Sequence, residues 1–242
     1  MFFGFDGGSF CNAPFGSTNL SQRRHLCFQH PWTEVKDAQV VNDTAYCAFA
    51  NGLVILDVSD FANPSFVSKV YLQGGGEGIF VKDNYVYLAD GDKGLVIIDV
   101  TTPANPDLVG SYNTPGYAAD VFVQDSLAYV ADSYSGGLQI IRVSDPANPS
   151  FVGSFNAGNS KGVFVQDSLA YMADYYSGLH IINVSDPATP SLVGSYNTPS
   201  CAEGVFVKDS LAYVADGNSG LQIINVSDPA NPDSIGSYDT HR

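Results

Sequence analysis

The chain has 242 residues, 45% of them hydrophobic, with 10 basic and 25 acidic side chains and a net charge of −15 at pH 7. This apolar content supports a folded core and excludes a disordered chain. The negative charge disfavours nucleic acid and anionic membrane surfaces as partners. Its apolar runs are far shorter than the roughly 20 residues that cross a bilayer, so we expect no membrane insertion.

Residues 1–33 have no counterpart elsewhere in the sequence and form a non-repeat N-terminal segment. Their start, MFFGFDGGSF, has neither a basic region nor a sustained apolar stretch, so no signal peptide is recognised. Cys11 and Cys27 lie in this segment and could pair in an oxidising compartment. His25 and His30 also lie there, without the spacing of metal ligands.

From residue 34 onward the sequence repeats itself. The aspartate of a YxAD element recurs every 42 residues, and a degenerate copy, AYCAFANGLVILDVSDFANP, precedes these four. Self-similarity at about 40 to 50 residues indicates a propeller or an array, because one such unit cannot bury its own faces. We divide residues 34–242 into five repeats, 34–75, 76–116, 117–159, 160–200 and 201–242.

Each copy contains runs of strand length, such as GVFVKD, LAYVAD, GLQIINV and SLVGSY, separated by turn residues. Apolar residues follow one another directly at Val163, Phe164 and Val165, so both faces of each sheet must be covered. Radial stacking of small antiparallel sheets meets this condition. We therefore predict an all-β propeller with five four-stranded antiparallel blades; a parallel β-solenoid is the alternative.

The runs LVILDVSDFANP, LVIIDVTTPANP and IINVSDPANP resemble the LVIVD repeat, a family of β-propeller units found mainly in bacterial and archaeal surface or secreted proteins. The layout GVFVxD…YVAD…GLxIIxV is also similar to the NHL type of propeller repeat. The LVIVD resemblance covers about residues 34–242. It implies a propeller fold and an extracellular or cell-surface location, compatible with a larger surface protein. Because the shared residues occupy packing and turn positions, no catalytic residue carries over.

The repeated aspartates admit two interpretations. A ring of carboxylates could bind Ca²⁺, which takes about six to eight oxygen ligands. Equivalent positions in adjacent blades lie too far apart to share an ion, so we expect each aspartate to accept hydrogen bonds from loop N–H groups instead. These aspartates are Asp90, Asp132, Asp174 and Asp216.

Other candidate chemistry is sparse. No nucleophile elbow, zinc-protease motif or phosphate-binding loop is present. His180 is replaced by Gln139 and Gln222 in sibling copies, which indicates a strand residue at a polar rim. Cys47 stands where other copies have larger apolar residues, so we predict a small core residue. We expect no cofactor and no metal site.

The loops between successive blades, and those between the second and third strands, should share one face around the channel mouth, where function usually sits. These loops differ between copies while the scaffold stays uniform, which favours recognition of an asymmetric partner. The candidate ligand-binding residues on this face are Glu77, Tyr117, Asp120, Tyr134, Lys161, Tyr175, Tyr176 and Glu203.

We therefore predict a non-enzymatic binding or scaffold module for a protein or a glycan. Tyr134, Tyr175 and Tyr176 are the expected anchors, because loop tyrosines offer large, fairly rigid contact area with a hydroxyl group. The alternative is a propeller hydrolase or lyase, which would use a bound metal or a pair of carboxylates about 5 to 9.5 Å apart. Its candidate carboxylates are Glu77, Asp120 and Glu203.

Overall fold

The structure, a computed structural model, describes residues 34–134 and 136–240, and within them the chain is almost entirely β. The strands form five sheets, each with four antiparallel strands in sequence order, as predicted. A short 3₁₀ turn, Gly217–Ser219, is the helical element of this part of the chain. In the same residues no helix has the length and apolar character needed to span a membrane.

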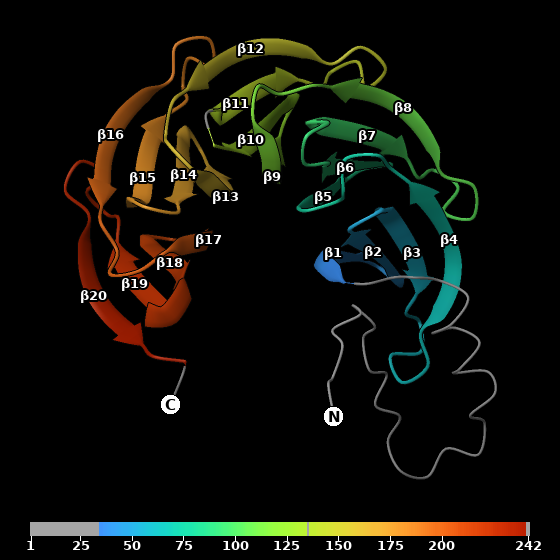
Figure 1. Ribbon diagram of the computed structural model, residues 1–242, viewed down its shortest axis with the longest axis horizontal. Coiled ribbons are helices and arrows are strands. Elements are labelled where there is room, and N and C mark those ends of the chain that lie inside the picture. The colour runs from blue at the N-terminus through green and yellow to red at the C-terminus, as the bar shows by residue number, and fades with distance from the viewer. Residues whose placement is uncertain (1–33, 135, 241–242) are drawn as a thin grey trace, which may run out of the picture.

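Each sheet is one blade, and we number the blades 1 to 5 along the chain (Figure 1). Blade 1 contains β1 (Val35–Val41), β2 (Thr44–Phe49), β3 (Gly52–Asp57) and β4 (Ser65–Tyr71). Blade 2 contains β5 (Ile79–Lys82), β6 (Tyr85–Ala89), β7 (Leu95–Asp99) and β8 (Asp107–Tyr112). Blade 3 contains β9 (Tyr117–Gln124), β10 (Leu127–Ser133), β11 (Gly137–Arg142) and β12 (Ser150–Phe155). Blade 4 contains β13 (Ser160–Gln166), β14 (Leu169–Asp174), β15 (Gly178–Asn183) and β16 (Ser191–Tyr196). Blade 5 contains β17 (Ala202–Lys208), β18 (Leu211–Asp216), β19 (Leu221–Asn225) and β20 (Asp233–Tyr238).

The turns explain much of the recurring sequence. The hairpin between the first and second strands of each blade has an Asn or Asp with φ between 52° and 57°, a left-handed conformation that these residues tolerate better than most. In the SDPANP loop of blade 3, Asp145 accepts hydrogen bonds from the Ala147 N–H at 3.2 Å and from the Asn148 side-chain amide at 2.9 Å. The repeated polar residues therefore fix the turns.

The core lies between blades. We call the side of a blade that faces the next blade along the chain its leading face, and the other side its trailing face. Tyr129 and Leu138 on the leading face of blade 3 pack against Val165 and Met172 on the trailing face of blade 4. Cys47 is buried on the trailing face of blade 1, as predicted for a core residue.

In blades 2, 3 and 4, a glycine on the outer strand allows this strand to pack closely against a loop of the following blade. A Cβ placed on Gly110, Gly153 or Gly194 would lie 2.0–2.3 Å from a proline carbonyl oxygen in the next blade's SDPANP-type loop. Ser68 stands at the equivalent place in blade 1, and its hydroxyl donates a hydrogen bond to the Pro103 carbonyl at 2.5 Å. The glycine of the outer-strand GSY element is therefore a docking position for the neighbouring loop.

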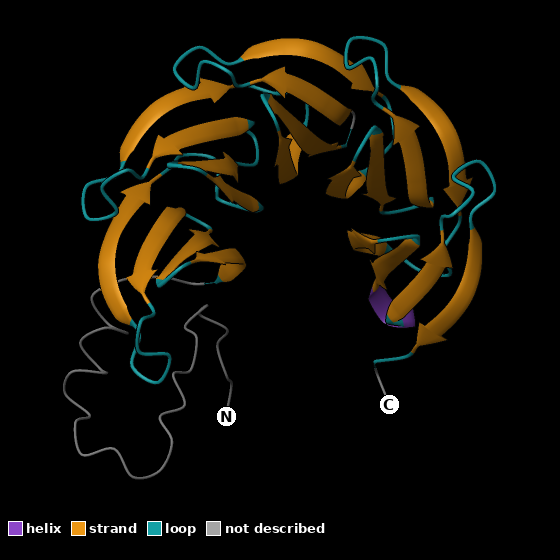
Figure 2. Ribbon diagram, turned by 180° about the vertical axis from the view of Figure 1, so that it is seen from behind, coloured by secondary structure: helices purple, strands orange, loops and turns teal. Residues whose placement is uncertain are grey.

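The five blades form an arc that does not close. Figures 1 and 2 show β1, β5, β9, β13 and β17 lining the inside of the arc, with an opening between blade 1 and blade 5. Among the described strands, no pairing joins these two blades. The predicted five-bladed architecture is thus confirmed, while the two ends of the arc stay apart.

Candidate functional site

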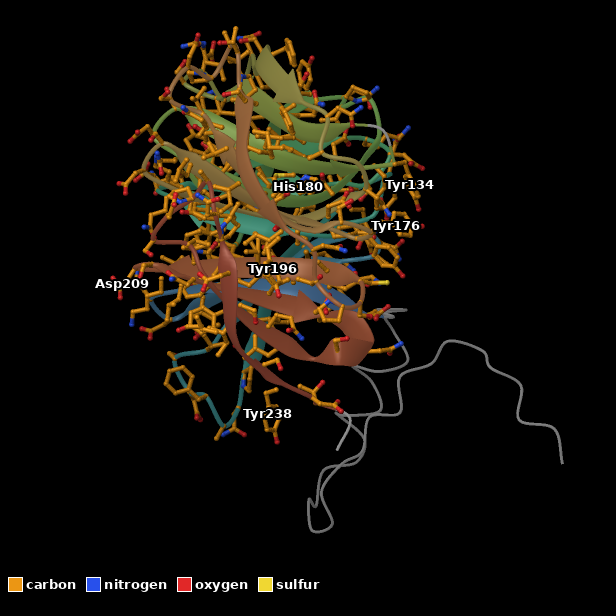
Figure 3. The ribbon with its side chains drawn as sticks, turned by 90° about the vertical axis from the view of Figure 1, so that its left-hand side faces the viewer. Tyr134, Tyr176, His180, Tyr196, Asp209 and Tyr238 are labelled. Carbon is orange, nitrogen blue, oxygen red and sulfur yellow. The ribbon has the colours of Figure 1, made fainter. Side chains whose placement is uncertain are left out.

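The divergent loops gather on one face of the arc. Figure 3 shows Tyr134 and Tyr176 at one edge of the molecule and Asp209, in the hairpin between β17 and β18, at the opposite edge. Tyr134 follows β10, and Tyr176 lies between β14 and β15. Both come from connections between second and third strands, and these two connections lie on the same face of the arc.

Four tyrosines and a lysine form a continuous group on this face, which we call the tyrosine row. The Tyr117 and Tyr134 rings have centroids 6.1 Å apart at 77°, and those of Tyr175 and Tyr176 are 5.0 Å apart at 84°. Lys161 joins the two pairs, because its Nζ lies 5.8 Å from the Tyr134 centroid and 5.9 Å from that of Tyr175. Such geometry suits cation–π attraction and edge-to-face ring contact.

Acidic side chains flank the row. Glu77 Oε1 accepts a hydrogen bond from the Tyr117 hydroxyl at 2.5 Å, and burial together with this contact raises the Tyr117 pKa. Next to blade 5, a hydrogen bond with Cys201 and the negative charge of Glu203 raise the pKa of Tyr175. Both phenols therefore stay protonated at neutral pH and can serve as hydrogen-bond donors.

The backbone of the row is held by Asn159, which the sequence analysis did not single out. Its Oδ1 accepts a hydrogen bond from the Tyr134 N–H at 3.2 Å, and its carbonyl oxygen accepts one from the Tyr175 N–H at 3.0 Å. Tyr134 has a φ of 68°, which is costly for a bulky residue. Since asparagine is common in loops, no sequence signal distinguished this one.

Asp120 has contacts of another kind. It lies on β9, where its carboxylate accepts hydrogen bonds from the Val121 N–H at 2.8 Å and from the Val163 N–H of blade 4 at 2.9 Å. Burial raises its pKa to about 7. Asp37 makes the same bridge from blade 1 to blade 2, accepting from the Ile79 N–H at 3.0 Å. These carboxylates tie together the strands that line the inside of the arc.

The repeated aspartates are buried acceptors for loop groups, as expected. Asp132 accepts hydrogen bonds from the Thr114 hydroxyl at 2.7 Å and the Gly116 N–H at 2.8 Å. Asp216 repeats this arrangement with Thr198 at 2.6 Å and Ser200 at 2.9 Å. Within the described residues, no group of three or more His, Cys, Asp or Glu is placed to hold a metal ion.

The interpretation of His180 needs correction. Its sibling Gln139 is buried, and the Gln139 side-chain amide donates a hydrogen bond to the Gly136 carbonyl. His180 pairs with Met172 across β14 and β15, and burial lowers its pKa. The position therefore lies on the trailing face between blades rather than at a polar rim. The glutamines of blades 3 and 5 donate hydrogen bonds to the adjoining loop there, whereas His180 is partly buried and its Nδ1 has no hydrogen-bond partner among the described residues.

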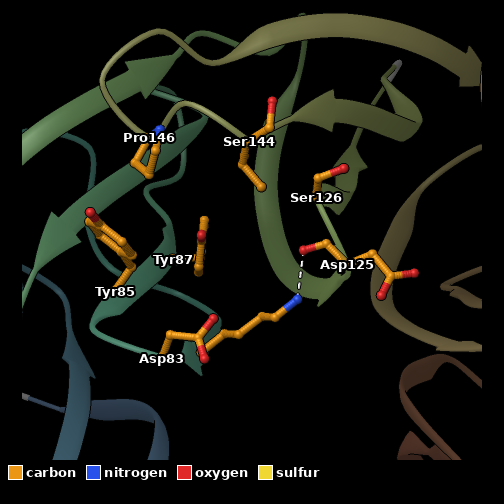
Figure 4. A pocket seen from close by; sticks show the side chains of 9 residues that line it. Asp83, Tyr85, Tyr87, Asp125, Ser126, Ser144 and Pro146 are labelled. Carbon is orange, nitrogen blue, oxygen red and sulfur yellow. Dashed lines mark hydrogen bonds between the residues drawn. The ribbon is translucent and has the colours of Figure 1, made fainter.

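A cavity of about 310 Å³ lies on the opposite face, between blades 2 and 3 (Figure 4). Lys82 lines the cavity and donates a hydrogen bond to the Asp125 carbonyl at 2.6 Å. Gln124 makes the same bridge to the Asp167 carbonyl at 2.9 Å in the next blade. Because this contact repeats between blades, it belongs to the scaffold.

Comparison with known proteins gives one family and several similar folds. The profile described as "LVIVD repeat" matches residues 34–71, 73–114, 115–157, 157–198 and 201–240. No curated protein matches the chain.

Three solved structures have a similar fold. A functionally unknown protein from Desulfotomaculum acetoxidans is 14% identical with a TM-score of 0.72, over 87% of this chain and 71% of that one. A putative 6-phosphogluconolactonase from Bacteroides fragilis is 12% identical with a TM-score of 0.68, over 84% and 70%. The computationally designed Ika8 protein is 9% identical with a TM-score of 0.68, over 86% of this chain. The chain spans 63% of the length of Ika8. At these identities the likeness shows the fold alone.

Proposed function

Because this chain belongs to the LVIVD-repeat family, whose shared residues build the scaffold, we propose from its divergent loops that it is a non-enzymatic binding module. The tyrosine row is its binding surface, and the partner is a protein or a glycan. The observation that carries this proposal is the exposure of two rings on a rigid scaffold: Tyr134 is 74% and Tyr176 75% exposed. Large exposed aromatic side chains in fixed positions are the residues that most often anchor interfaces.

The backbone of Tyr134 supports this proposal. A positive φ at a bulky residue is unfavourable and persists only where the surroundings hold it, a feature that clusters at binding and active sites. Here Asn159 supplies the restraint, since its side chain and its backbone contact the two halves of the row. The rings are thereby positioned before any partner arrives, which lowers the entropy cost of binding.

The charges around the row bias the choice of partner. Glu77 and Glu203 flank the tyrosines, and the whole chain has a net charge of −15. We therefore propose a neutral or basic partner, whose attraction in the basic case weakens as salt rises. The family resemblance supports an extracellular or cell-surface setting, in which this chain acts within a larger surface protein.

The carboxylates favour binding over the hydrolase or lyase alternative. Glu77 is already hydrogen-bonded to the Tyr117 hydroxyl, and Asp120 to two backbone N–H groups. Each therefore stabilises the loops or the blade junction. A general acid–base role would require a carboxylate directed at a substrate.

The test is to identify a ligand by glycan array and by affinity capture with mass spectrometry, and then to titrate it against variants. Tyr134→Ala and Tyr176→Ala should fold normally and bind at least about tenfold more weakly, because anchor truncation typically costs about 2 kcal/mol. The matched control is Tyr71→Ala, which removes a tyrosine that is 64% exposed on the outer strand β4. Equal losses for all three variants, or no loss at Tyr134 and Tyr176, would contradict the proposal.

A further inference from the structure

The repeated aspartate of blade 4 has fewer contacts than its counterparts in blades 3 and 5. In blade 3, one oxygen of Asp132 accepts from the Thr114 hydroxyl and the other accepts from the Gly116 N–H. In blade 4, Ala157 stands in the place of this threonine, so the hydroxyl is missing. Asp174 is 1% exposed, and its Oδ2 has no hydrogen-bond partner among the described residues. One oxygen of this buried carboxylate can therefore accept another donor.

The other oxygen of the same carboxylate holds the loop of the tyrosine row. Asp174 Oδ1 accepts hydrogen bonds from the Tyr176 N–H at 3.1 Å and from the Ser177 N–H at 2.7 Å. The Tyr176 side chain is 75% exposed, so the position of its ring depends strongly on the backbone of this loop. A change in the surroundings of Asp174 is thereby transmitted to an exposed ring of the row.

A titratable side chain lies next to this carboxylate. His180 stands where blades 3 and 5 have glutamine. Asp174 pairs with Gly178 across β14 and β15, so His180, two residues further along β15, is its diagonal neighbour on the same face of the sheet. The Nδ1 atom of His180 also has no hydrogen-bond partner among the described residues. Two neighbouring side chains thus each have an unpartnered polar atom.

A third difference between the blades lies at the same place. Ser160, which pairs with Asp174 across β13 and β14, stands where blades 3 and 5 have alanine, and its hydroxyl also lacks a partner within the part of the chain that the structure describes. Asp90 of blade 2 has an unpartnered oxygen as well, but Val96 takes the place of the histidine there. Blade 4 therefore combines a free carboxylate oxygen with a group that can gain a proton.

Few of the described charged groups surround the histidine. Lys161 of β13 contacts the rings of the tyrosine row, and β16 places Ser195 opposite the histidine. The face of blade 3 across the junction contributes Tyr129, whose pKa is raised by burial. Burial lowers the pKa of His180, and the negative charge of Asp174 opposes this change. Because His180 is only partly buried, protons can reach it in the folded protein.

We propose that His180 and Asp174 form a pH-sensitive support for the loop of Tyr176, in which the protonated imidazole donates a hydrogen bond to the free oxygen of the carboxylate. A neutral imidazole has a proton on one nitrogen, whereas an imidazolium has one on both, so protonation makes Nδ1 a donor. A charge-assisted hydrogen bond then fixes the carboxylate and, through it, the loop. Both side chains are positioning residues, and this role does not depend on which partner the tyrosine row binds.

Nuclear magnetic resonance of the full chain between about pH 5 and about pH 8 tests the support without a partner. The Tyr176 and Ser177 amide signals should shift in one transition, with the midpoint of the His180 imidazole signal and below about pH 6.5. His180→Gln, which introduces the residue of blades 3 and 5, should fold normally and abolish this transition. Ala157→Thr should reduce it while the histidine still titrates, because the new hydroxyl occupies the carboxylate.

The matched control is Gln222→His in blade 5. It places a histidine beside Asp216, whose two oxygens already accept from Thr198 and Ser200, so the Gly217–Ser219 turn should not follow its titration. Amide signals of Tyr176 and Ser177 that do not change as His180 titrates overturn the proposal. So does an unchanged transition in His180→Gln, or an equal response of the blade 5 turn in the control.

Discussion

Blades 4 and 5 have nearly the same sequence and the same sheet, yet they differ in what covers them. Ala173 and Leu179 in blade 4 are completely buried, while Ala215 in blade 5 is exposed and Leu221 is partly so. Hydrogen bonding within the two sheets is equivalent. The comparison separates the two sources of stability in a repeat protein: each repeat determines its own strands and turns, but its apolar side chains stabilise the fold only where a neighbour removes them from water.

We expect the largest difference in stability between the two blades when one equivalent isoleucine in each is replaced by alanine. Ile181→Ala creates a cavity in a fully enclosed site and should lower the free energy of unfolding by about 2 to 5 kcal/mol. Ile223→Ala removes a partly exposed side chain at the equivalent position, so at low protein concentration its cost should be roughly half as large. Urea denaturation at one fixed concentration measures both.

Equal losses at the two isoleucines would mean that blade 5 is covered as completely as blade 4. A smaller loss at Ile223 that does not depend on protein concentration would sharpen the comparison, because incomplete burial of this side chain alone would then account for it.

We expect a smaller effect on stability from the hydrogen bond that the Asp120 carboxylate of blade 3 accepts from blade 4. The equivalent residue in blade 5 is Gly204, which has no carboxylate. Burial raises the folded-state pKa of Asp120 to about 7. The folded state then holds a proton that the unfolded state, with a pKa of about 4, has already released. Stability should therefore fall as pH rises from about 4 to about 7, and Asp120→Asn should flatten this slope in thermal melts. A variant slope equal to that of the wild type would assign the pH dependence to other groups.

Most of the fold was predictable because it depends on residues that lie close together in the sequence. Turn residues such as Asp145 and the paired apolar residues of each strand specify four strands per copy without reference to distant contacts. The membership of the tyrosine row was also predictable, since propeller topology places Tyr134, Lys161 and Tyr175 on one face. The opening of the arc was not, because it depends on the angle between successive blades, which no residue pattern encodes.

The bridges between blades were missed for a related reason. Asp37 and Asp120 each accept a hydrogen bond from a backbone N–H about one repeat later in the chain, at Ile79 and Val163. The sequence shows these aspartates as isolated acidic residues, in positions where other copies have glycine. Only the arrangement of the inner strands in space shows that one carboxylate can accept a hydrogen bond from a backbone N–H group at the edge of the next inner strand.

Hydrogen exchange followed by mass spectrometry tests the contrast between the covered and the uncovered blade most directly. The equivalent segments are residues 169–183 in blade 4 and 211–225 in blade 5. At low protein concentration the segment of blade 5 should exchange much faster, because local opening exposes fewer buried contacts there. Equal, strong protection of both segments at the lowest concentration would contradict an uncovered blade 5.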